Sequence, residues 1–364
     1  MTEDRSERLA RLTGALVDVP SVSGDEDAIL ARLREAMPPT GFEIAWDDDT
    51  VVFYTPEVRR PDAPLVVCAG HVDTVPADGN VPGRREGDAI VGRGASDMKG
   101  SLALMVEMAN GVASGELASD LDVGFVLYGR EELPFGDSAL MPFLRRCPAA
   151  SAIDLAIVME PTDNTIELGC LGNLDARIVA HGVAAHSARP WFGHNAVHDA
   201  IRALAPLTDL PTRDVEIDGL AFREVVSVTT IAGGVAANVV PDRAEARVNM
   251  RYAPTHTPAE AERRLRELLG VRGVEVEVVG NAPPGPVPEG DPLVARLQRA
   301  TGGRARAKQA WTSVAEFGAV DIPSVNLGPG DPQYAHREDE RIELASLERG
   351  YELMTAFLAG AAEG

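Results

Sequence analysis

The sequence predicts an α/β fold, a mixed and mostly parallel sheet sandwiched by helices, with a smaller α+β domain inserted into it. Two observations support this prediction. Up to Pro161, short continuous apolar runs such as "APLVVCAG" and "DLAIVMEP" alternate with helical stretches, as they do in sheets buried on both faces. After Pro161, apolar and polar residues alternate in "TIELGCLGNLDARIVAHG" and "AEARVNMRYAP", which is typical of antiparallel strands with one exposed face.

The order of the elements follows from capping and turn signals. The first forty residues read as two helices; the second opens on Ser23-Gly-Asp-Glu26, a capping-box pattern, and stops at Pro38-Pro39. The next predicted elements are a strand over 65–69, a helix from about Met98, a strand over 122–129, a helix in "DSALMPFLRRC" and a strand over 155–159. Such alternation predicts parallel strands joined by helices.

At 364 residues the chain exceeds the usual size of one domain. We expect residues 1–173 and 283–364 to form one domain and residues 174–282 to form the insertion. The Pro- and Gly-rich segment "NAPPGPVPEGDP" (281–292) is the predicted linker back to the first domain.

Composition narrows the classes of partner. A net charge of −22 disfavours nucleic acid, because such a surface repels phosphates. The sequence has no run of eighteen apolar residues for a membrane span, and "MTEDRSERLARL" lacks the apolar core of a signal peptide. Three cysteines without a CxxC pair form no disulfide framework. We therefore expect a cytoplasmic protein that binds neither nucleic acid nor membrane.

Residues of metal-ligand type follow the predicted strands of the larger domain. Because ligands bind at the carboxyl ends of strands in open α/β sheets, these side chains are expected to lie close together. Histidine with several carboxylates suits zinc or a similar divalent ion, and carboxylates can bridge two ions. The residues are His71, Asp73, Asp97, Glu131, Glu132, Glu160 and His336.

Each of these residues also has an ordinary structural explanation. Asp97 before a helix is most simply an N-cap, and adjacent glutamates at a strand end are usually solvated. His71 could belong to a turn, and His336 could lie on the surface. Five strand or loop ends that supply ligand-type residues to one sheet nevertheless favour a metal site.

Five motifs, in order, resemble a known family. "GHVDTVP", "GRGASDMKG", "EEL", "MEP" and "GPGDPQYAH" are similar to those of the dinuclear-zinc aminoacylase and carboxypeptidase superfamily, over essentially the whole chain. The resemblance implies a zinc-exopeptidase-like catalytic domain with two Zn²⁺ ions per subunit, for which Co²⁺ can substitute. It also implies that the inserted domain is a lid that forms a homodimer.

The resemblance assigns roles to the residues at the strand ends. It implies that Asp97 bridges the two ions, that His71 and Glu160 complete one metal site, and that Glu132 and His336 complete the other. Asp73 is expected to orient His71 by accepting its second ring N–H. Glu131 is the expected general base.

The same resemblance implies further residues around the substrate. His186 is expected to reach the transition-state oxyanion, in some members of the superfamily across the dimer. Arginine can hold a carboxylate through two hydrogen bonds, which suits Arg251. The expected substrate-binding residues are Arg251, Asn238, Arg189, Thr312, Gly328 and Gly330. Ser313 stands where many relatives carry Asp.

Within the superfamily, "HGVAAHSARPWFGHNAVH" and "RAKQAWTSVAEFGAVDIPSVNLGPGDPQYAH" are most similar to the actinobacterial succinyl-diaminopimelate desuccinylases. These hydrolyse N-succinyl-LL-2,6-diaminopimelate to succinate and LL-diaminopimelate, a step in lysine biosynthesis. Leu171 departs from the polar residue expected there. The alternatives are acetylornithine deacetylase, another amidohydrolase or carboxypeptidase acting on a small N-acyl amino acid, and a non-catalytic metal-binding scaffold.

Overall fold

The computed structural model describes residues 4–269 and 273–360, and the chain forms two compact units. The first comprises residues 1–169, 286–306 and 312–364, and the second comprises residues 170–285 and 307–311. The sequence had placed the inserted unit within 174–282, and the second unit of the structure also contains residues 170–173, 283–285 and 307–311. In the described part of the chain, no helix combines the length and the apolar character that crossing a bilayer takes.

The first unit is built on a mixed sheet in the order β1-β2-β6-β3-β7-β17-β8-β16. β3 pairs in parallel with both β6 and β7, and β17 pairs in parallel with β7, whereas β1, β2 and β8 join antiparallel. The strands are β1 (Phe42–Asp47), β2 (Val51–Pro56), β3 (Leu65–His71), β6 (Asp122–Tyr128), β7 (Leu155–Val158), β8 (Ile166–Leu168), β16 (Ala305–Ala307) and β17 (Ser324–Asn326). All residues of β3, β6 and β7 are buried, as their continuous apolar runs predicted.

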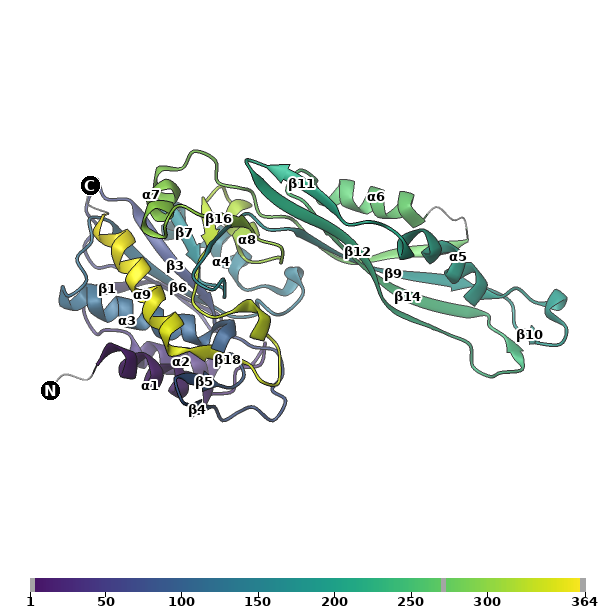
Figure 1. Ribbon diagram of the computed structural model, residues 1–364, viewed down its shortest axis with the longest axis horizontal. Helices are drawn as coiled ribbons and strands as arrows, with labels where there is room; N and C mark the ends of the chain where they lie inside the picture. Colours follow the sequence, from purple (N-terminus) through teal and green to yellow (C-terminus); the bar gives the residue numbers. More distant parts are fainter. Residues whose placement is uncertain (1–3, 270–272, 361–364) are drawn as a thin grey trace. The chain divides into compact units, whose positions relative to one another are not determined.

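Helices pack on this sheet in two groups (Figure 1). The helices α1, α3 and α9 contact one another, with α3 against β3, while α8 lies against β7 and β17 and contacts α4. The helices are α1 (Arg5–Val17), α2 (Asp27–Ala36), α3 (Gly100–Ser114), α4 (Leu140–Arg146), α7 (Pro292–Ala300), α8 (Val314–Gly318) and α9 (Leu344–Ala359). The fold class predicted from the sequence is therefore confirmed.

A small antiparallel sheet, in the order β18-β5-β4, joins two distant parts of the first unit. It contains β4 (Arg84–Glu86), β5 (Ala89–Val91) and β18 (Arg341–Glu343). The short helix η1 (Ala95–Lys99) follows β5 in the sequence, and the short helix η5 (Pro332–Tyr334) precedes β18. Because β5 leads into η1 and β18 follows η5, their pairing ties these two loop regions together.

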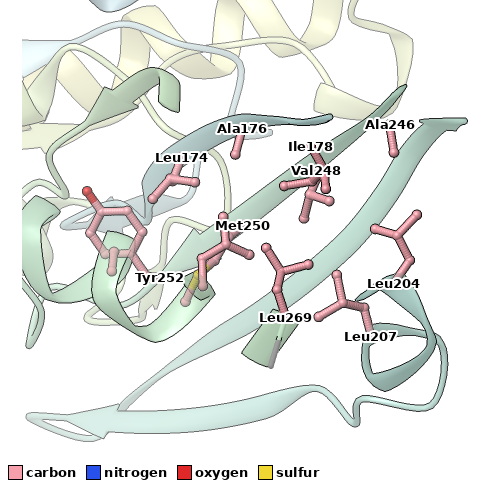
Figure 2. Close-up of a cluster of buried hydrophobic side chains, with 12 residues drawn as sticks. Leu174, Ala176, Ile178, Leu204, Leu207, Ala246, Val248, Met250, Tyr252 and Leu269 are labelled. Carbon is pink, nitrogen blue, oxygen red and sulfur yellow. The ribbon is translucent and has the colours of Figure 1, made fainter. Parts of the chain in front are cut away.

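The second unit is an antiparallel sheet in the order β11-β12-β14-β9-β15, with α5 and α6 packed on one face. Alternate residues such as Leu174, Ala176 and Ile178 of β9 point into a core shared with these helices (Figure 2). The elements are β9 (Gly172–His181), β10 (Ala185–His186), β11 (Arg213–Ile217), β12 (Leu220–Gly233), β13 (Val239–Val240), β14 (Arg243–Tyr252), β15 (Val274–Ala282), α5 (Ala196–Thr208) and α6 (Pro258–Leu269).

Candidate metal centre

Three neighbouring parallel strands carry ligand-type residues at their carboxyl ends. His71 is the last residue of β3, Glu131 and Glu132 follow β6, and Glu160 follows β7. Because β6, β3 and β7 are adjacent and parallel, their ends meet at one edge of the sheet. Asp97, within η1, reaches the same place, since its carboxylate lies 3.0 Å from the His71 ring.

The carboxylate of Asp97 lies between two histidines. Its Oδ1 is 3.0 Å from Nε2 of His71, and its Oδ2 is 3.4 Å from Nε2 of His336. Each oxygen of the carboxylate thus faces one histidine, which is the arrangement needed to bridge two ions. His336 and Arg130 hold φ angles of 64° and 62°, a left-handed conformation that costs free energy for residues other than glycine and is common at functional sites.

Two further carboxylates complete the groups around these histidines. Oε1 of Glu160 lies 3.8 Å from Nε2 of His71, and Oε1 of Glu132 lies 2.8 Å from Nε2 of His336. Two ligands of one tetrahedral zinc ion stand about 3.3 Å apart, since each is about 2.0 Å from the metal. Donor separations between 2.8 and 3.8 Å are therefore compatible with divalent ions, and the division of these ligands between two ions stays a prediction.

The ligand atoms also converge in threes. Those of His71, Asp97 and Glu132 lie within 4.8 Å of one another, and so do those of His71, Glu131 and Glu160. The second group shows that Glu131, the predicted base, stands among the ligand atoms themselves. The chain therefore has a donor set that can hold divalent metal.

Both histidines have raised pKa values, so bound protons supply positive charge among these carboxylates. Hydrogen bonds to Asp97 and Glu132 raise the pKa of His336 to about 10. Burial alone would lower the pKa of His71, but the neighbouring carboxylates of Asp73 and Asp97 outweigh it and hold the pKa well above its usual value. Metal ions bind neutral imidazole, so their binding would release these protons.

Glu131 is the carboxyl group with the opposite behaviour. Burial, followed by the negative charge of Glu160, raises the pKa of Glu131 well above its usual range. A carboxylate that holds a proton more tightly is a better base, which is the property expected of a proton acceptor in hydrolysis.

Asp73 makes contacts that differ from the prediction. Nδ1 of His71 lies 2.9 Å from the main-chain carbonyl of Asp73 and 3.6 Å from its carboxylate, so the main chain is the nearer partner of the ring. The carboxylate instead accepts from the amides of Glu131 and Glu132, each at 3.1 Å, and from the Ser23 hydroxyl at 2.7 Å. Asp73 therefore orients the turn that carries both glutamates.

Ser23 was assigned by sequence to a capping box, and this assignment was wrong. No side chain caps the start of α2, and Glu26 accepts from the amide of Gly24 at 2.7 Å while Ser23 donates to Asp73. The local sequence pattern could not predict that Ser23 donates to Asp73, because Asp73 lies fifty residues further along the chain.

Comparison with known proteins decides the family. The model of peptidase family M20/M25/M40 matches residues 67–360. The chain belongs to this family. It is 38% identical over 347 residues to the succinyl-diaminopimelate desuccinylase of Corynebacterium glutamicum, covering 92% of each chain. It is 39% identical over 352 residues, 96% of this chain and 97% of the other, to a Mycobacterium tuberculosis protein provisionally named as the same enzyme.

The fold of this M20 family member also matches a solved structure. An aminopeptidase from Bacillus cereus superposes with a TM-score of 0.77 at 20% identity, covering 97% of this chain and 98% of that one. At that identity, the match supports the fold alone.

Three predicted substrate contacts lie in the first unit of this M20 chain, and packing accounts for each residue there. The buried Thr312 hydroxyl donates to Asn326 at 2.8 Å. A Cβ on Gly328 would stand 2.3 Å from the Met159 carbonyl, and one on Gly330, whose φ is 90°, would stand 2.6 Å from the Ser96 hydroxyl. Their substrate contacts stay predictions.

The other predicted contacts lie in the second unit, at opposite ends of its sheet. Arg251 is near the end of β14, opposite Asn173 in β9. Arg243, at the start of β14, is about 27 Å away by strand rise and pairs with His181. His186 follows His181 in sequence and pairs in β10 with Val239 (Figure 1), so Arg251 and His186 lie apart within one chain.

His186, Asn238 and Arg189 are exposed and lie together. The Ser187 amide donates to the Asn238 carbonyl at 2.8 Å, and the Arg189 amide donates to the His186 carbonyl at 2.7 Å. The Ala188 amide donates to Nδ1 of His186 at 3.1 Å, which leaves Nε2 as the N–H of the neutral ring. His186 is thereby prepared to donate a hydrogen bond from Nε2.

Proposed function

We propose that this M20 family chain hydrolyses N-succinyl-LL-2,6-diaminopimelate to succinate and LL-diaminopimelate. The observation that carries the proposal is the arrangement of His71 and His336 on the two oxygens of Asp97, with Glu131 among the ligand atoms. The substrate is taken from the named relatives, which match this chain along almost its whole length.

The proposed cofactors are two divalent ions, zinc with cobalt as a substitute. His71, Asp97 and Glu160 would hold one ion, and Asp97, Glu132 and His336 the other. When bound, such a pair of ions activates water and stabilises the negative charge that develops on a scissile carbonyl oxygen.

Glu131 is the proposed base. Its carboxylate accepts the proton of the attacking water and later returns a proton to the leaving amine nitrogen, so that the carboxylate is regenerated. The Asp73 carboxylate accepts hydrogen bonds from the amides of Glu131 and Glu132, which keeps the base beside the ligand atoms.

Arg251 is the proposed ligand of a substrate carboxylate. Its Nε donates to Asn249 at 3.1 Å, and burial lowers the pKa of its guanidinium, against the opposing effect of the Asp175 carboxylate. It lines a cavity of about 360 Å³ together with Leu171, Arg223 and Gln309. A half-buried guanidinium with several N–H donors is suited to bind an anionic group of the substrate.

We propose that two copies of the chain assemble through the second unit. Since Arg251 and His186 lie at opposite ends of one sheet, a small substrate can contact both only if they come from different subunits. Residues 225–233 of β12 pair with β14 on one side, and among the described residues no strand pairs with their other edge. Such an edge is suited to pair with a second copy.

The test compares two substrates. We expect the zinc- or cobalt-loaded protein to release succinate from N-succinyl-LL-2,6-diaminopimelate with a kcat/KM at least about 100-fold above that for acetate release from N-acetylornithine, because Arg251 can pair with an additional carboxylate. A preference for N-acetylornithine would make the chain a deacetylase. Turnover of neither substrate by metal-loaded protein would refute the assignment.

A further inference from the structure

A buried ion pair, Arg93 with Glu340, lies beside the metal centre. The two residues are 4% and 0% exposed, and Nη1 of Arg93 donates to Oε2 of Glu340 at 2.8 Å. Oε1 of Glu340 accepts from the amides of Ser96 and Asp97, at 3.2 and 3.1 Å. Glu340 is therefore bonded directly to the peptide that precedes the central carboxylate of the site.

The same pair holds the segment that carries His336. Nη1 of Arg93 also donates to the main-chain carbonyl of Arg337 at 3.3 Å, and the Glu340 carbonyl accepts from the Gly92 amide at 2.9 Å. Arg93 and Glu340 thus link the loop that ends in Asp97 to the loop that contains His336.

Stability alone is a poor explanation for this pair. Removing two charges from water costs about as much free energy as their attraction returns, so an apolar pair of similar size would serve the core as well. An apolar pair cannot orient its neighbours through hydrogen bonds. A carboxylate accepts hydrogen bonds at both oxygens and so fixes the orientation of the amides that donate to it.

We propose that Glu340, held by Arg93, is a positioning residue that sets the separation of Asp97 and His336 and thereby the affinity of the centre for metal. These two residues, 3.4 Å apart, come from loops more than two hundred positions apart in sequence, and Glu340 contacts the first loop while belonging to the second. The inference rests on the proposed function only in so far as Asp97 and His336 hold an ion.

The test is a Co²⁺ titration of Glu340→Gln, in competition with a chromophoric chelator. Glutamine has one acceptor oxygen, so either orientation of its amide sets an N–H₂ group against N–H donors, of Arg93 or of the two main-chain amides. We expect the affinity for Co²⁺ to fall by about 10- to 100-fold, the usual effect of losing a residue that orients a ligand. The visible absorption of the bound Co²⁺ should also change, because the ligands move.

The matched control is Asp339→Asn. It removes the same charge one position away, but its carboxylate is exposed and binds only Arg337 among the described residues. We expect its Co²⁺ affinity and spectrum to equal those of the wild type. Folded Glu340→Gln with wild-type affinity and spectrum would overturn the proposal, whatever its melting temperature, because a merely structural residue changes stability without changing the ligand geometry.

If Glu340→Gln does not fold, Arg93→Lys takes its place. Lysine keeps the buried positive charge but replaces the planar guanidinium by a single ammonium group, so a smaller loss of Co²⁺ affinity, about tenfold, is expected. Unchanged affinity in this variant would also overturn the proposal. Because the titration needs no substrate, a wild-type protein that binds Co²⁺ but hydrolyses no N-succinyl substrate would refute the proposed function and leave this inference standing.

Discussion

The two units of this chain place their functional residues in different ways. In the first, histidines and carboxylates from distant segments meet around one carboxylate, that of Asp97, at one edge of a buried sheet. In the second, Arg251 and His186 stand at opposite ends of an antiparallel sheet. The first unit therefore contains all residues of its candidate metal centre. In the second unit, the two proposed binding elements lie apart, and on our proposal of a dimer they serve one substrate from different subunits.

The largest expected effect distinguishes the two adjacent glutamates of the first unit. We expect Glu131→Gln to lower kcat by about 10²- to 10⁴-fold at unchanged metal content, because it removes a proton acceptor. Glu132→Gln should instead lower the affinity for one ion, since it removes a ligand. Metal analysis and kcat at saturating Zn²⁺ measure both; equal metal loss in the two variants would contradict the division of roles.

The next effect tests the separation within the second unit. We expect His186→Ala to lower kcat by about 10²- to 10³-fold, since its Nε2 N–H is a proposed oxyanion donor. Mixing this variant with Glu131→Gln should restore up to about a quarter of wild-type activity, because half of the dimers are mixed and one of their two sites is complete. The activity after exchange of subunits measures this.

If His186 served its own chain, the same mixture would stay inactive, since no site in a mixed dimer would contain both residues. Mixing Glu131→Gln with Glu132→Gln is the control: both residues belong to the first unit, so every site of such a mixed dimer lacks one of them. Restored activity in that control would contradict a self-contained centre in the first unit.

The smallest effect concerns the stability of the second unit. Burial alone would raise the pKa of Glu224, but hydrogen bonds from Arg264 and the Ala253 amide outweigh it and lower the pKa. A lowered pKa means that the stabilisation is present above the unfolded pKa, about 4.3, and is lost as the pH falls through the folded pKa. We expect Glu224→Gln to lower the free energy of unfolding at pH 7 by about 2 kcal/mol.

Urea unfolding of wild type and Glu224→Gln at pH 7 and at pH 3 measures this effect, and the difference between them should shrink at the lower pH. Asp214→Asn, which removes a half-exposed carboxylate paired with Arg223, is the control and should leave the stability unchanged. A difference that grows on acidification would show that Glu224 is not stabilised by its charged partner.

Sequence reasoning was informative for the first unit because its chemistry follows the chain locally. His71 ends a recognisable strand, and Glu131, Glu132 and Glu160 lie shortly after two others, so parallel pairing alone predicts that they meet. The expected roles of Asp97 as a bridging carboxylate and of His336 as a metal ligand came only from the resemblance to relatives. The sequence around His336 has no pattern that predicts its position near the other residues.

Other contacts depended on pairings that a single sequence does not specify. Alternation predicted the strands of the second unit, but which residue of β14 faces which residue of β9 is fixed by register, so the distance between Arg251 and His186 could not be read. Ser23 and Glu340 make side-chain hydrogen bonds to residues far along the chain, and the local sequence around neither residue specifies its partner.

The bonds of Asp73 have a consequence for how the site can vary. The amides of Glu131 and Glu132 each donate a hydrogen bond to one of the two oxygens of the Asp73 carboxylate. A shift of this carboxylate would move both amides together, so the main-chain positions of the proposed proton acceptor and of the proposed metal ligand are coupled. A substitution at Ser23 therefore acts on the positions of both glutamates, because the Ser23 hydroxyl donates a hydrogen bond to the same carboxylate.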